Sequence, residues 1–103
     1  MKASAPGKVI LFGEHAVVYN RPALAVPVTQ IHVDVEILGS SSHQGIWIHA
    51  PGIDLNAELN SLPSDHPVAS VILKLFQLIE ISQPPSLDIS ITSTIPVASG
   101  LGS

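Results

Sequence analysis

Residues 31–37 read IHVDVEI, in which apolar and polar side chains alternate without a break. Successive side chains of a strand point to opposite faces of a sheet, so this pattern predicts a strand with one buried and one exposed face. Residues 87–92, LDISIT, repeat the pattern. Two half-polar strands favour a sheet that is covered mainly on one face, and therefore an α+β fold over a doubly wound parallel sheet.

The N-terminal part is expected to supply a further strand. Residues 9–12, VILF, form a continuous apolar run beside glycine, which is typical of a core strand covered on both faces. Residues 24–28 are also apolar, but Pro22 and Pro27 cannot donate to a sheet ladder. This segment is therefore predicted to be irregular or to lie at a sheet edge.

The middle of the chain contains one more predicted strand and a long loop. Residues 46–50, IWIHA, are predicted to pair antiparallel with residues 31–37 across the polar segment 39–45. Residues 51–65 are rich in Pro, Asn, Asp and Ser and are assigned as loop.

One amphipathic helix is expected between this loop and the last strand. Apolar side chains recur at helical spacing over residues 68–79, and this stripe is predicted to be core. Ser64 or Asp65 is the expected N-cap, with Pro67 in the first turn. The helix must end before Pro84.

Composition limits the classes of function. Hydrophobic residues make up 46% of the 103 residues and charged residues 12%, which excludes a disordered tail and indicates one domain or part of one. The formal net charge is −4 without a Lys/Arg cluster, so no nucleic-acid partner is expected. Without cysteine there is no disulfide framework. A helix needs about 20 apolar residues to span a bilayer, and no apolar run is nearly that long. No export signal is visible either, so we expect a cytoplasmic protein without membrane contact.

Two segments could carry chemistry. Residues 98–103, ASGLGS, follow a predicted strand, and their backbone N–H groups could surround a polyphosphate, although an ordinary turn has the same composition. Lys8 precedes the strand 9–12, and Glu14 and His15 follow it. Taken singly, each of these three side chains could simply be solvated. The histidines do not have the spacing of a zinc site.

Taken together, the two segments resemble a known family. Residues 5–19, APGKVILFGEHAVVY, followed by PALA at 22–25, resemble the N-terminal motif of mevalonate kinases. Residues 96–103, PVASGLGS, resemble the phosphate-loop motif of the wider GHMP superfamily, which also includes galactokinase, homoserine kinase and phosphomevalonate kinase. Within that superfamily, the sequence EHAVVY at 14–19 favours mevalonate kinase.

The resemblance implies a fold and a reaction. The fold would be the α+β N-terminal domain of the GHMP kinases, which is similar to domain 2 of ribosomal protein S5. Residues 1–103 would form a truncated part of it that ends inside the phosphate-binding loop. The implied reaction of the full-length protein is ATP-dependent phosphorylation of mevalonate to 5-phosphomevalonate in isoprenoid biosynthesis, and family members are often homodimers.

The resemblance also implies roles for individual residues. Lys8 would be catalytic, near the transferred phosphate, and Glu14 and His15 would bind mevalonate. The ATP phosphates would be bound by Lys8 together with Pro96, Val97, Ala98, Ser99, Gly100, Leu101, Gly102 and Ser103. The magnesium ligands and the catalytic base would lie beyond Ser103, so the chain itself would hold no metal and is expected to be inactive alone.

Two alternatives stay open at this stage. One is another small-alcohol kinase of the superfamily, such as phosphomevalonate kinase or galactokinase. The other is a non-catalytic remnant that acts as a binding module.

Overall fold

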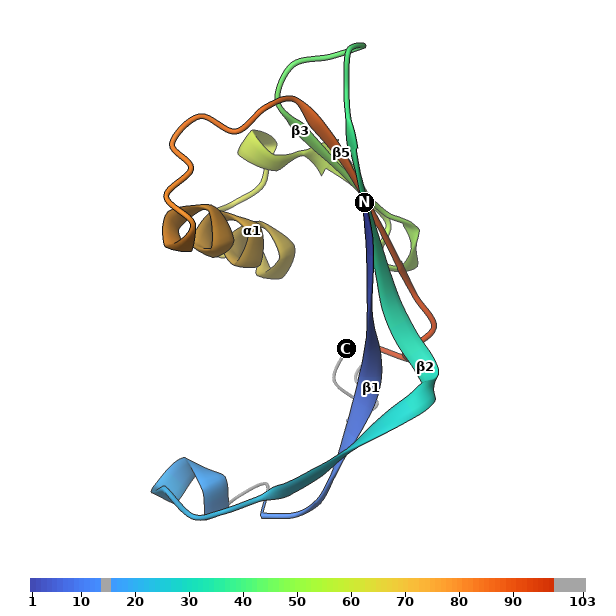
Figure 1. Ribbon diagram of the computed structural model, residues 1–103, viewed down its shortest axis with the longest axis vertical. Coiled ribbons are helices and arrows are strands. Elements are labelled where there is room, and N and C mark those ends of the chain that lie inside the picture. The colour runs from blue at the N-terminus through green and yellow to red at the C-terminus, as the bar shows by residue number, and fades with distance from the viewer. Residues whose placement is uncertain (14–15, 98–103) are drawn as a thin grey trace. The chain divides into compact units, whose positions relative to one another are not determined.

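The computed structural model describes residues 1–13 and 16–97, which form a mixed α+β fold (Figure 1). The elements in chain order are β1 (Lys2–Phe12), the 3₁₀ helix η1 (Ala16–Tyr19), β2 (Leu24–Gly39), β3 (Ile46–Ala50), η2 (Pro51–Ile53), β4 (Leu55–Glu58), η3 (Leu59–Ser61), α1 (Pro67–Leu78) and β5 (Leu87–Ser93). The strands form one sheet in the order β1-β2-β5-β3-β4. The α+β class expected from the half-polar strands is confirmed.

The pairing of β3 differs from the sequence-based expectation. β3 does not pair with β2, because β5 lies between them. It runs parallel to β5, with Ile48 opposite Ile89, and antiparallel to β4, with Ile48 opposite Ala57. The predicted hairpin was wrong because a distant apolar strand has the same alternation as residues 31–37 and takes the inner position.

β2 is a single strand that begins at Leu24 and includes Pro27. Residues 24–28 are regular strand, so the irregular alternative was wrong, but they extend past the end of β5 and have a sheet edge on that side, as the other alternative predicted. β2 and β5 run antiparallel, because Thr94 N–H bonds to the His32 carbonyl and Ser40 N–H to the Ser86 carbonyl. Pro27 lies on the part of β2 that extends past the end of β5 at Ser93, where one missing N–H group is tolerated.

The chain divides into two compact units. Unit 1 consists of residues 1–2 and 35–91, and unit 2 of residues 3–34 and 92–103.

Unit 1 contains the apolar core. Its buried members come from β3, β5, η3 and α1: Ile46, Ile48, Leu59, Ala69 and Ile89. Half-buried apolar side chains pack against them: Val35, Ile37, Leu55, Leu62, Val68, Ile72, Phe76, Leu87 and Ile91. The alternating positions of the strands supply one face, which α1 covers (Figure 1).

The helix itself was predicted correctly, but its start was not. α1 spans Pro67–Leu78, and its N-cap is His66, whose Nδ1 accepts the N–H of Val68 at 3.2 Å. Neither Ser64 nor Asp65 is the cap. At the other end, Ile81 N–H bonds to the Phe76 carbonyl and Glu80 takes the left-handed conformation with φ 58°, which is a Schellman motif without glycine.

Only part of the predicted helix stripe is core. Val68, Ile72 and Phe76 pack against it, whereas Val71 and Leu75 are 68% and 50% exposed. A sheet covers one side of the helix only, so the apolar residues at the margin of the stripe remain in solvent.

The segment 51–65 was assigned as loop, but it contains η2, β4 and η3. β4 was missed because it has only four residues, and Asn, Ala and Glu are uncommon in strands even though LNAE alternates between apolar and polar residues.

Unit 2 has little core among its described residues, where only Gly7 and Ile95 are buried. β1 is longer than predicted, and Val9 and Ile10 are half-buried while Leu11 is 58% exposed. The expectation that residues 9–12 are covered on both faces was therefore wrong.

Candidate functional site

Lys8, the predicted catalytic cation, lies on β1 with an exposed side chain. Gly7 before it is buried, and the strand ends at Phe12. The extended backbone thus presents the Lys8 ammonium group to solvent. The other two residues predicted at this site, Glu14 and His15, lie outside the described residues.

Gly13 ends this strand in a conformation that requires glycine. Its φ is +95°, and an added Cβ would lie 2.7 Å from both the Ala23 Cα and the Pro22 carbonyl oxygen. These atoms belong to the backbone and cannot swing aside. The two ends of the segment between β1 and β2 therefore touch at Gly13 and Ala23, so that residues 13–23 form a closed loop.

The predicted phosphate-binding segment begins just after β5. Ile95 is 6% exposed, and its N–H bonds to Ser93 Oγ at 3.1 Å. Val97 is 70% exposed. The rest of the predicted loop, residues 98–103, lies outside the described residues.

Thr94 ties this segment to β2. Its Oγ1 accepts the N–H of His32 at 2.9 Å and donates to the His32 carbonyl at 3.3 Å. The N–H of Thr94 bonds to the same carbonyl at 2.9 Å. Sequence reasoning missed Thr94, because the only available signal was a run of hydroxyl residues at 92–94 before Pro96.

Unit 2 thus contains both predicted motifs. β1, which carries Lys8, and β5, which leads to Pro96, are the two neighbours of β2 in the sheet. Two segments about ninety residues apart in sequence are placed on either side of one strand. The strand order therefore brings the strand that carries Lys8 and the strand that precedes Pro96 to the two sides of β2.

The chain is similar to known kinases over almost all of its length. A curated mevalonate kinase of Pyrococcus horikoshii is 36% identical over 112 aligned residues, which cover 98% of this chain and 33% of that protein. Over the region that it spans, the chain is similar to mevalonate kinases. It spans about a third of the length of the curated relatives it matches. No family model matches the chain.

Solved structures of related kinases have a similar fold over the same region. The mevalonate kinase of Methanococcus jannaschii superposes with a TM-score of 0.75 at 28% identity, covering 98% of this chain and 34% of that one. A phosphomevalonate kinase of Streptococcus pneumoniae, in complex with phosphomevalonate and AMPPNP, gives a TM-score of 0.73 at 21% identity over 99% of this chain and 32% of that one. The fold expected from the resemblance to mevalonate kinases is confirmed.

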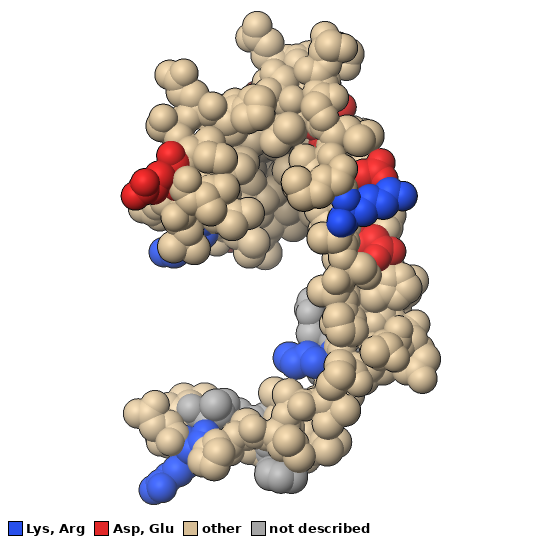
Figure 2. Space-filling model, viewed as in Figure 1, with Lys and Arg blue, Asp and Glu red and all other residues tan. Residues whose placement is uncertain are grey.

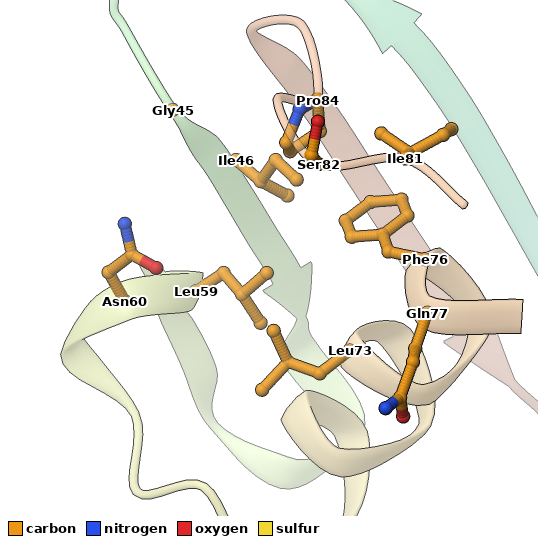
Figure 3. Close-up of a pocket in the computed structure, with 10 residues that line it drawn as sticks. All are labelled: Gly45, Ile46, Leu59, Asn60, Leu73, Phe76, Gln77, Ile81, Ser82 and Pro84. Atoms are coloured by element: carbon orange, nitrogen blue, oxygen red, sulfur yellow. The ribbon is translucent and has the colours of Figure 1, made fainter. Parts of the chain in front are cut away.

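The described residues of the two motifs do not line a cavity that lies in unit 1. This cavity of about 600 Å³ lies between α1, η3, the start of β3 and residues 81, 82 and 84 (Figure 3). Its wall is mostly apolar, with Phe76, Leu59 and Ile46 turned toward one another.

Charged side chains are sparse on the face seen in Figure 2, and the shortest His–carboxylate contact among the described residues lies in unit 1. His43 Nε2 is 2.7 Å from Asp88 Oδ1, and His49 Nε2 is 3.6 Å from the same oxygen. The hydrogen bond to His43 holds the pKa of Asp88 below its ordinary value of 3.8, with desolvation opposing the shift. The ring of Trp47 lies 5.6 Å from that of His43.

Two further findings concern residues 1–13 and 16–97. Among them, no group of three or more His, Cys, Asp or Glu side chains could hold a metal ion. No helix in this part of the chain is long and apolar enough to cross a membrane.

Proposed function

We propose that the protein containing this chain transfers the γ-phosphoryl group of ATP to the primary hydroxyl of mevalonate, giving 5-phosphomevalonate for isoprenoid biosynthesis. The observation that carries the proposal is the similarity to curated mevalonate kinases, which extends over 98% of the chain and so takes in nearly all of both motifs. The proposed substrates are mevalonate and ATP. We also propose that the full-length protein is a cytoplasmic homodimer.

The proposed role of Lys8 follows from its charge and exposure. Phosphoryl transfer needs little covalent help from the protein, because most of the catalysis comes from positioning and from stabilising charge on the phosphoryl oxygens. The Lys8 ammonium group is exposed on β1 and able to approach a phosphate in solvent. Glu14 and His15 follow β1 in the sequence, and we propose that they bind mevalonate.

We propose that residues 96–103 bind the ATP phosphates through backbone N–H groups. The solved neighbour that holds AMPPNP shares the fold of this chain, which supports a nucleotide as the donor. A bound magnesium ion would supply charge neutralisation between the phosphates. As the resemblance to the superfamily implies, we propose that the ligands of this ion lie beyond Ser103 and that residues 1–103 alone are inactive.

A chimeric enzyme tests the function directly. The region of the Pyrococcus horikoshii kinase that matches this chain is replaced by residues 1–103, and mevalonate-dependent ADP release is measured. We expect turnover with mevalonate and much less with galactose, homoserine or phosphomevalonate. A preference for one of the other alcohols would assign the chain to another kinase of the superfamily, and a folded chimera without any kinase activity would contradict the proposal.

A further inference from the structure

The segment that leads into the proposed phosphate loop is fixed at one residue pair. Thr94 and the backbone of His32 are joined by three hydrogen bonds, of which two use the Thr94 hydroxyl group. Directly after Thr94, Ile95 is one of the few buried residues of unit 2. Its N–H is in turn held by Ser93 Oγ.

The Thr94 hydroxyl group replaces a backbone carbonyl group of a regular antiparallel strand pair as hydrogen-bond acceptor. In an antiparallel pair, the N–H of His32 would bond to a carbonyl of the neighbouring strand. β5 ends at Ser93, and the Thr94 side chain takes over as the acceptor for that N–H at 2.9 Å. The chain can therefore leave the sheet at Thr94 while the last bonded position of β2 keeps its partner.

We propose that Thr94 is a positioning residue for ATP, whose hydroxyl group fixes the point at which the phosphate-binding segment leaves the sheet. Pro96, the first residue of that segment, lies only two residues beyond Thr94. The hydrogen bonds between Thr94 and His32 fix the start of this segment relative to β2. They thereby also fix it relative to β1, which lies on the other side of β2. The proposal rests on the proposed function in that residues 96–103 are taken to bind the phosphates.

Thr94→Val is the variant that tests it, since it keeps the shape of the side chain and removes the hydroxyl. In the chimeric kinase, we expect the KM for ATP to rise about three- to tenfold, the range that corresponds to one net hydrogen bond. The KM for mevalonate should stay within about twofold, because β1 and its loop are untouched. Thr94→Ser should restore the KM for ATP. Thr92→Val, at an exposed β5 position, is the matched control and should change neither KM.

A second measurement does not depend on activity. Amide hydrogen exchange of the 103-residue chain should be faster at His32 and Ile95 in Thr94→Val than in the wild type or Thr94→Ser, with β3 unchanged. An inactive wild-type chimera would overturn the proposed function. The exchange data would still show whether the Thr94 hydroxyl group holds the segment to His32. Unchanged exchange at His32, an equal rise of both KM values, or failure of Thr94→Ser to rescue would overturn the role of Thr94.

Discussion

Unit 1 and unit 2 divide the tasks of this chain. Unit 1 contains nearly all of the buried apolar side chains and the single α-helix of the described residues, but none of the predicted site residues. Unit 2 contains both motifs, yet only Gly7 and Ile95 are buried among its described residues. Unit 1 therefore stabilises the fold by burying apolar side chains, whereas unit 2 is held by strand pairing and a few specific contacts near the proposed site.

The largest effect is expected at Lys8. Lys8→Met in the chimeric kinase should lower kcat at least about a hundredfold, because the variant removes a charge that stabilises the transferred phosphoryl group. The melting temperature should not change, since the side chain is exposed and lies outside the core. Lys74→Met, at an exposed helix position of unit 1, is the matched control. Near wild-type turnover of Lys8→Met would contradict the catalytic role of Lys8.

The second prediction concerns the core of unit 1. Ile48 is completely buried, so Ile48→Ala should lower the free energy of unfolding by about 2 to 5 kcal/mol. Ile53→Ala, the same change at a side chain that is 50% exposed, should cost much less. Urea denaturation of both variants makes the comparison. Equal losses would mean that burial in the core of unit 1 is not what stabilises the chain.

The third prediction compares two glycines with positive φ, one in each unit. An added Cβ at Gly13 meets backbone atoms of Pro22 and Ala23, whereas at Gly45 it first meets Glu58 Oε1 at 2.8 Å, the far end of a flexible side chain. Gly13→Ala should therefore cost about 1 to 3 kcal/mol of stability and raise the KM for mevalonate, since it opens the base of loop 13–23. Gly45→Ala should cost less and leave the KM for mevalonate unchanged. A reversed order in chemical denaturation would contradict the contact at Gly13.

The smallest effect is expected at Asp88, which contacts His43 and His49 in unit 1 and is only partly buried. Because the pKa of Asp88 in the folded chain is lowered, its charge stabilises the fold at pH values above 3.8, and this contribution is lost as the pH falls through the lower folded pKa. Asp88→Asn should therefore be less stable than the wild type at pH 6, and the difference should shrink below pH 4. Asp54→Asn is the control, because Asp54 is exposed and Asn tolerates its left-handed backbone. A difference that grows on acidification would contradict the lowered pKa.

Only some residues of the candidate site could be predicted from the sequence. Lys8, Glu14, His15 and residues 96–103 could be named from the sequence because each motif is contiguous and its residue types are distinctive. Thr94 and the contact of Gly13 with Ala23 could not be found this way. Both depend on which strands pair with β2, and that pairing joins residues far apart in the chain.

The sequence alone was enough to predict the local elements with strong periodicity and to show the resemblance to mevalonate kinases. The helical spacing over 68–79 and the alternation over 87–92 correspond to α1 and β5 because these periods reflect backbone geometry alone. Only the tertiary structure decided that β5 lies between β2 and β3, that Pro27 is accommodated within a strand, and that half of the helix stripe stays exposed. The reason is that several strands carry the same alternating pattern, and their order is set by which apolar faces can be buried together under one helix.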